Sequence, residues 1–147
     1  MVAWTLLAGA GIPLVGVLNH GIARSVGNPV AATAVTFTVA LLVAALVTVP
    51  FYGVPGLPQL TGAPLVSYAP GLILVFYALS ATIIIPRFGA ASFVAFILIA
   101  QLVTSALVDQ FGLFGMVRRP IDGLRLAGLV VVASGILLME IASHRKA

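Results

Sequence analysis

The chain has no cysteine and very little charge. Only 7% of its 147 residues are Asp, Glu, Lys or Arg, whereas a soluble domain carries about 25%. Without cysteine, no disulfide framework, thiol chemistry or Cys-type zinc site can form. Because 62% of the residues are hydrophobic, water would solvate the surface poorly. The composition therefore predicts an integral membrane protein.

Sequence patterns typical of enzymes and of nucleic-acid binding are also missing. Seven Lys and Arg residues outnumber three Asp and Glu residues, but the positive charges are scattered near the ends of apolar stretches. No basic run with interleaved aromatic residues occurs, so no nucleic-acid partner is expected. No nucleophile–base set, phosphate-binding loop or paired carboxylates occur either, and a lone His does not make a metal site. We therefore expect no enzyme activity, no cofactor and no metal.

Five apolar stretches are long enough to cross a membrane as helices. Turns rich in Pro, Gly and polar residues separate them, and Pro70-Gly71 predicts a kink in the third. The expected fold class is all-α, with five transmembrane helices per chain in a single domain, residues 1–147. The expected spans cover about residues 3–22, 29–51, 65–85, 90–108 and 124–141.

The positive charges are divided almost evenly between the two membrane faces that these spans define. One face would hold Arg118, Arg119 and Arg125, and the other would hold Arg24, Arg87, Arg145 and Lys146. An excess of Lys and Arg normally sets one orientation, and three against four is no decisive excess. The split favours dual topology, in which two oppositely inserted copies form an antiparallel homodimer of ten helices. A single orientation, set by a partner or by the first helix, is the alternative.

The fourth stretch carries a polar stripe. Gln101, Ser105 and Asp109 follow one another at intervals of four, so they lie on one helix face. At 1.5 Å per residue, Gln101 lies about 12 Å from Asp109 along the axis, close to the midplane of a ~30 Å core. Lipid satisfies no hydrogen-bonding group of a primary amide. Gln101 is therefore expected either to line a substrate cavity or to bond another helix.

Asp109 has two interpretations. It could attract a cation or take up a proton, or it could form an ion pair with Arg125 or Arg24 at the end of its helix. Asn19 and His20 in the first stretch could bind solute or relay protons. The alternative for that stretch is a close-packed seam built on small residues. Gly128 and Gly135 predict a helix-packing face on the fifth stretch, and this face is a candidate dimer seam.

Taken together, these residues resemble a known family. The strongest match is the block formed by Gln101-Leu102, Ser105, Asp109, Phe111-Gly112 and Gly115, followed by Arg125, Gly128 and Gly135. Asn19, Gly27-Asn28-Pro29 with Ala32, and Pro86 with Gly89 fit the same pattern. The chain resembles the bacterial YdcZ-type family of small membrane proteins, which belongs to the drug/metabolite transporter superfamily.

The resemblance implies a five-helix unit that pairs in antiparallel fashion or is fused to a second unit, and that acts as an exporter. Small multidrug resistance relatives have four helices and a carboxylate in the first one. Here the first span has no Asp or Glu, which argues against carboxylate-driven antiport by that route.

The expected function is secondary transport of a small solute across the bacterial inner membrane, with alternating access around a midplane site. The expected substrate-binding residues are Gln101, Ser105, Asn19 and Asp109. The expected partners are a second, inverted copy of the chain, membrane lipid, and a small-molecule or ion substrate. A small ion channel and a non-transporting accessory subunit are the alternatives.

Overall fold

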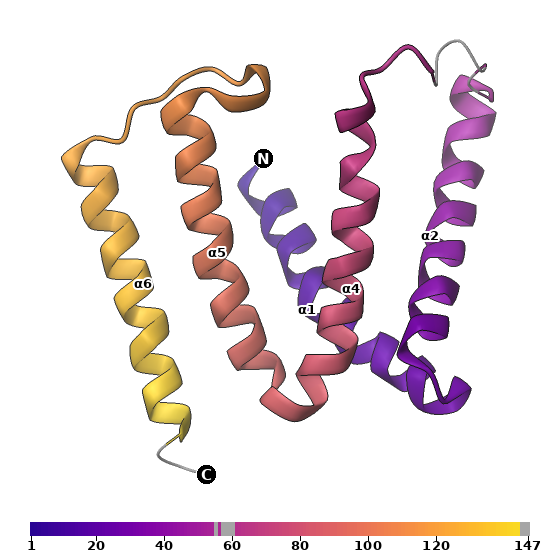
Figure 1. Cartoon of the computed structure of the whole chain (residues 1–147), viewed down its shortest axis with the longest axis horizontal. Coiled ribbons are helices and arrows are strands. Elements are labelled where there is room, and N and C mark those ends of the chain that lie inside the picture. The colour runs from indigo at the N-terminus through magenta and orange to yellow at the C-terminus, as the bar shows by residue number, and fades with distance from the viewer. Residues whose placement is uncertain (55, 57–60, 145–147) are drawn as a thin grey trace. The chain divides into compact units, whose positions relative to one another are not determined.

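The computed structural model describes residues 1–54, 56 and 61–144, and every regular element in this part of the chain is helical. Figure 1 traces the elements in order: α1 (Val2–Val26), α2 (Pro29–Tyr52), the 3-10 helix η1 (Leu65–Tyr68), α4 (Ala69–Phe88), α5 (Ala90–Phe111), the 3-10 helix η2 (Leu113–Gly115) and α6 (Gly123–His144). Among the described residues, five helices are long and apolar enough to cross a membrane, with η1 and α4 counted together. This confirms the prediction of an all-helical chain with five such segments. Their ends differ from the predicted ranges by no more than four residues.

The described chain separates into two compact units, Met1–Ala90 and Ala91–Ala147. Unit 1 contains α1, α2, η1 and α4, and unit 2 contains α5, η2 and α6. The grouping of all five helices into one domain stays a prediction.

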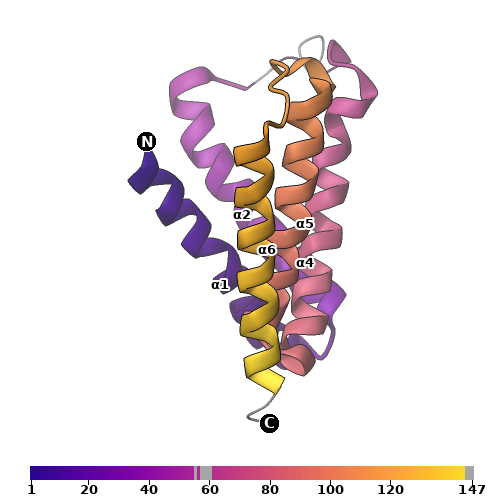
Figure 2. The ribbon, with the colours of Figure 1, turned by 90° about the vertical axis from the view of Figure 1, so that its left-hand side faces the viewer.

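Within unit 1, a tight turn reverses the chain between α1 and α2. Gly27 adopts a left-handed conformation with φ 76°, and its N–H donates to the carbonyl of Ala23 at 2.8 Å. This conformation favours glycine. Asn28 then caps α2, because its side-chain oxygen accepts from the N–H of Val30 at 2.8 Å, and Pro29 opens the helix. Figure 1 shows α1 and α2 spreading apart from this turn, whereas in the view of Figure 2 both helices lean toward the same side.

The packing of α1 against α4 depends on small residues. Gly16 is buried on α1, and a Cβ there would lie 2.9 Å from the Cβ of Ala81 and would collide with Cδ1 of Ile85. Ala78 and Ala81 are buried on the facing part of α4. Small side chains let membrane helices approach closely, so the seam predicted as an alternative for the first span is present at Gly16.

The kink predicted at Pro70-Gly71 is not an interruption inside a helix. Pro70 lies in the first turn of α4, directly after η1. Proline fits that position because the first-turn N–H groups have no intrahelical partner. The change from 3-10 to α-helical geometry occurs at Tyr68–Ala69.

Within unit 2, side chains and backbone together hold the connection from α5 to α6. The N–H of Arg119 donates to the Asp109 carbonyl at 2.8 Å, and the N–H of Ile121 donates to Oε1 of Gln110 at 2.6 Å. Gly112 has φ 62°, and a Cβ there would press on the Met116 carbonyl at 3.1 Å. Glycine is therefore needed at this position for both its conformation and its lack of a side chain.

Candidate functional site

The buried amide of Asn19 is the centre of a hydrogen-bond network in unit 1. Its nitrogen donates to the hydroxyl of Thr82 on α4 at 2.6 Å and to the hydroxyl of Thr33 on α2 at 3.2 Å. Its oxygen accepts from the hydroxyl of Thr36 on α2 at 2.7 Å. Asn19 is only 1% exposed. One side chain thus links all three long helices of the unit.

The threonines of this network are themselves anchored to their helices. The hydroxyl of Thr33 donates to the carbonyl of Pro29 at 2.9 Å, and the hydroxyl of Thr82 donates to the carbonyl of Ala78 at 2.7 Å. Both amide protons of Asn19 are used, and its oxygen keeps one spare lone pair. The sequence predicted Asn19 as a substrate-binding residue. In this structure its three side-chain hydrogen bonds are made with Thr33, Thr36 and Thr82.

A pocket of about 290 Å³ lies between α1 and α2, beside this network. Its walls are mainly Val, Leu and Ile side chains, and Asn19 and Thr36 are its polar lining residues. Such an apolar hollow with few polar groups is typical of small-molecule sites, although this one is at the small end of the range. The spare acceptor lone pairs of the Asn19 and Thr36 oxygens are the polar groups it offers.

Gln101 occupies the middle of α5, with eleven helix residues before it and ten after it. Its side chain is exposed on the chain, and no hydrogen bond within the described residues reaches its amide. Ser105, one turn further on, is also exposed, and its hydroxyl donates to its own helix at the Leu102 carbonyl, 3.0 Å away. The predicted stripe therefore presents an unpaired amide at the mid-height of a membrane-crossing helix.

Asp109 forms an ion pair with Arg125. Nη1 of Arg125 also donates to the Arg119 carbonyl at 3.4 Å. The backbone N–H of Arg125 donates to the Asp122 carboxylate at 2.7 Å. Asp122 thereby caps the start of α6. Of the two interpretations of Asp109, the structure shows the ion pair, with Arg125 rather than Arg24 as the partner.

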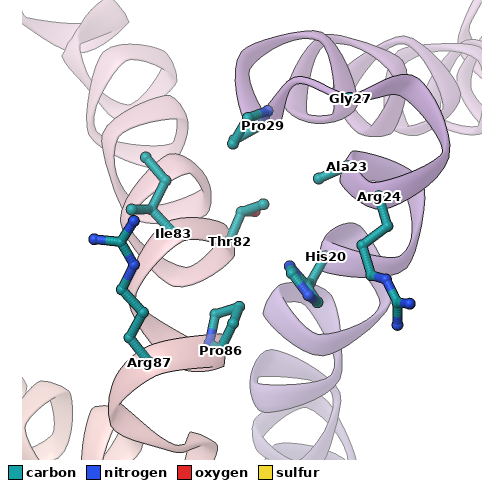
Figure 3. A pocket seen from close by; sticks show the side chains of 9 residues that line it. All are labelled: His20, Ala23, Arg24, Gly27, Pro29, Thr82, Ile83, Pro86 and Arg87. Atoms are coloured by element: carbon teal, nitrogen blue, oxygen red, sulfur yellow. The ribbon is translucent and has the colours of Figure 1, made fainter.

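Unit 1 also has a pocket of about 260 Å³ at the end where α1 and α4 finish and α2 begins. Figure 3 shows the His20 side chain between α1 and α4, facing Pro86, with Arg24 and Arg87 on opposite sides. The sequence predicted these two arginines only as charges that set the orientation in the membrane. Both arginines lie in the last turn of a long helix, and this shared position was the sequence signal that could have placed them at one end of the unit.

The proposed packing face on α6 is open in the single chain. Gly128 and Gly135 are exposed, and a Cβ at either position would meet no atom within 4 Å. Among the side chains that the structure describes, no three from His, Cys, Asp or Glu gather into a group that could hold a metal ion.

Five apolar membrane-crossing helices with a few placed polar groups define a multi-pass membrane protein. Residues 1–138 match the family described as "Putative inner membrane exporter, YdcZ", and the chain belongs to this family. It is thus a multi-pass inner-membrane protein of the transporter class rather than of a class of enzymes. No curated protein and no solved structure matches the chain.

Proposed function

We propose that the chain is a secondary transporter that exports a small solute and works as an antiparallel homodimer. Two oppositely inserted copies would supply the inverted symmetry that many transporters have within one chain. Rocking of the two halves would expose a midplane site first to one side of the membrane and then to the other.

The observation that carries this proposal is the exposed amide of Gln101 at mid-height on α5. A primary amide facing lipid leaves two donors and an acceptor unsatisfied, and each unsatisfied group costs several kcal/mol in a bilayer. If a second subunit covers this face of α5 and encloses a polar cavity, the Gln101 amide no longer faces lipid and the cost is removed. In the proposed dimer, Gln101 and Ser105 face that cavity and contact the solute.

Two further features support a paired assembly. The Lys and Arg residues are split three to four between the predicted faces, which allows insertion in both directions. Gly128 and Gly135 leave an open, small-residue surface on α6, of the kind on which membrane helices associate.

The other predicted site residues take supporting roles in the proposal. Asn19 holds α1, α2 and α4 together as one moving body, since its amide already bonds threonines of both neighbouring helices. Asp109 fixes the α5–α6 connection through Arg125. Both positions still border the translocation path in the proposed dimer, Asn19 through the pocket between α1 and α2.

Solute flux in reconstituted vesicles tests the function. A thermal-shift screen of the purified chain first identifies a stabilising solute, because a ligand that binds only the folded state raises its stability. Saturable uptake of that solute is expected, and Gln101→Leu should abolish it while the dimer stays folded. Ser105→Ala should reduce it as well. Val103→Leu, about 200° around the same helix from Gln101 and also exposed, is the matched control.

The rival functions give different results in the same vesicles. Conductance that does not saturate with solute concentration would indicate a channel. No flux for any stabilising solute would indicate an accessory subunit. Normal uptake by Gln101→Leu, with a melting temperature below that of the unmodified chain, would make this glutamine a packing residue and remove the proposed site.

A further inference from the structure

The charges of unit 1 are all of one sign. Residues 1–90 contain no Asp or Glu, and the three carboxylates of the chain come later, at Asp109, Asp122 and Glu140. The side-chain cations of this unit are Arg24 and Arg87. Within the described part of the chain neither arginine forms an ion pair. Each guanidinium therefore has five N–H donors available for groups outside the unit.

The fold brings these two cations to the same end of unit 1. Arg24 lies in the last turn of α1 and Arg87 in the last turn of α4. Because α1 and α4 pack together at Gly16 and run in the same direction, their carboxyl ends lie at the same end of the unit. The helix dipole favours cations at these ends. The dipole explains why an arginine is favourable at each of these helix ends. It does not explain which group accepts the hydrogen bonds that the guanidinium can donate.

The two arginines border one hollow, with their exposed guanidinium groups on opposite sides of it (Figure 3). Both belong to the wall of the pocket of about 260 Å³, together with His20 and Thr82. His20 is half-buried and its ring points into the space between α1 and α4 (Figure 3). Thr82 is held in place by Asn19 and by the Ala78 carbonyl. The pocket therefore has two exposed cations at its rim and the polar side chains of His20 and Thr82 on its inner wall.

We propose that this pocket binds the anionic group of an external ligand, a phosphate or a carboxylate, between Arg24 and Arg87. Planar guanidinium groups match the oxygens of such anions and bind them by charge-assisted hydrogen bonds. His20 adds a further donor from the inner wall. A lipid headgroup with a net negative charge and a soluble phosphate both present an unneutralised phosphate to these residues, whereas the phosphate of phosphatidylcholine is neutralised by its own choline group. The site does not depend on the proposed transport, since its test measures binding and not flux.

The test uses the purified full chain and two probes. Inorganic phosphate is titrated in neutral detergent, and the unfolding temperature is followed. In parallel, the chain is placed in nanodiscs of phosphatidylcholine alone or of phosphatidylcholine with phosphatidylglycerol. Stabilisation by phosphate assigns a soluble anion, and stabilisation only by phosphatidylglycerol assigns a lipid headgroup. Either result supports the site.

Matched variants connect the effect to the pocket. Arg24→Gln with Arg87→Gln should weaken anion binding by about tenfold or more, because charge-assisted hydrogen bonds are lost. Arg24→Lys with Arg87→Lys should keep part of the binding, which separates loss of charge from loss of fold. Arg119→Gln, an exposed arginine of unit 2, should bind like the unmodified chain. The proposal is overturned if neither probe stabilises the chain, if the double Gln variant binds as well as the original, or if Arg119→Gln loses as much.

Discussion

The side-chain amide of Asn19 donates a 2.6 Å hydrogen bond to the hydroxyl of Thr82, which lies 63 residues further along the chain. This bond joins α1 to α4, and the bonds from Asn19 to Thr33 and from Thr36 to Asn19 join α1 to α2. A buried amide in a membrane must find protein partners. Here the partners come from two different helices, so one residue fixes how three helices meet.

Asn19→Leu should therefore destabilise unit 1. Three hydrogen bonds at about 0.6 kcal/mol each amount to roughly 2 kcal/mol if they add. Thr36→Val, which removes one of the three with little change in shape, should cost about 0.6 kcal/mol. Unfolding in graded detergent mixtures measures both free energies. Equal, near-zero effects of the two variants would show that the network contributes nothing.

Gly16 offers a second test of the same bundle. Gly16→Ala should destabilise the chain by about 1–3 kcal/mol, because the new methyl group presses on Ala81 and Ile85. Gly9→Ala is the control on the same helix, since a Cβ there meets no atom within 4 Å. Thermal unfolding of both variants gives the comparison. A Gly16→Ala chain as stable as the Gly9→Ala chain would mean that α1 and α4 do not approach this closely.

The ion pair between Asp109 and Arg125 should contribute only modestly to stability. The two side chains are 30% and 38% exposed, and pairs of this kind typically contribute about 0.2–1 kcal/mol. A double-mutant cycle with Asp109→Asn and Arg125→Gln should give a coupling of that size. The coupling should shrink as salt is added, because exposed charges are screened. A coupling of zero at low salt would remove Asp109 from the support of the α5–α6 connection.

Association should depend on the open face of α6. Gly128→Leu and Gly135→Leu should each lower the dimer fraction, since a bulky side chain blocks close backbone approach. At 3.6 residues per turn, Val130 lies on the side of α6 opposite Gly128. Val130→Leu should therefore leave the dimer fraction unchanged. Cross-linking in vesicles measures the three fractions. If both glycine variants dimerise normally, the seam lies on another helix.

The membrane-crossing segments were predictable because their signals are local. Long apolar runs, and the turns rich in Pro and Gly that separate them, can be recognised within one continuous segment of the chain. The ion pair was only partly predictable: the sequence left Arg125 and Arg24 open as partners of Asp109. The fold of the α5–α6 connection, which the sequence does not determine locally, brings Arg125 to it.

The threonine partners of Asn19 were missed, although a signal was present. Each lies within about 6–10 Å of the same end of unit 1 when counted along its helix at 1.5 Å per residue. Asn19 lies at a similar distance from that end of the unit, so comparing these distances would have predicted that Thr33, Thr36 and Thr82 lie near Asn19. Which of them bond the amide depends on how the helices turn toward one another, and no local pattern specifies that.

The most direct test of the central proposal is the orientation of the chain in its membrane. Because the chain has no cysteine, single Ser25→Cys and Ser67→Cys variants can be labelled without background. These serines are exposed at opposite ends of unit 1, one near the end of α1 and the other in η1 just before α4. A membrane-impermeant maleimide added to sealed cells or vesicles reaches one side only. Dual topology predicts that each variant is labelled to about half of the amount seen after detergent is added. Full labelling of one variant and none of the other would show a single orientation and contradict the antiparallel homodimer.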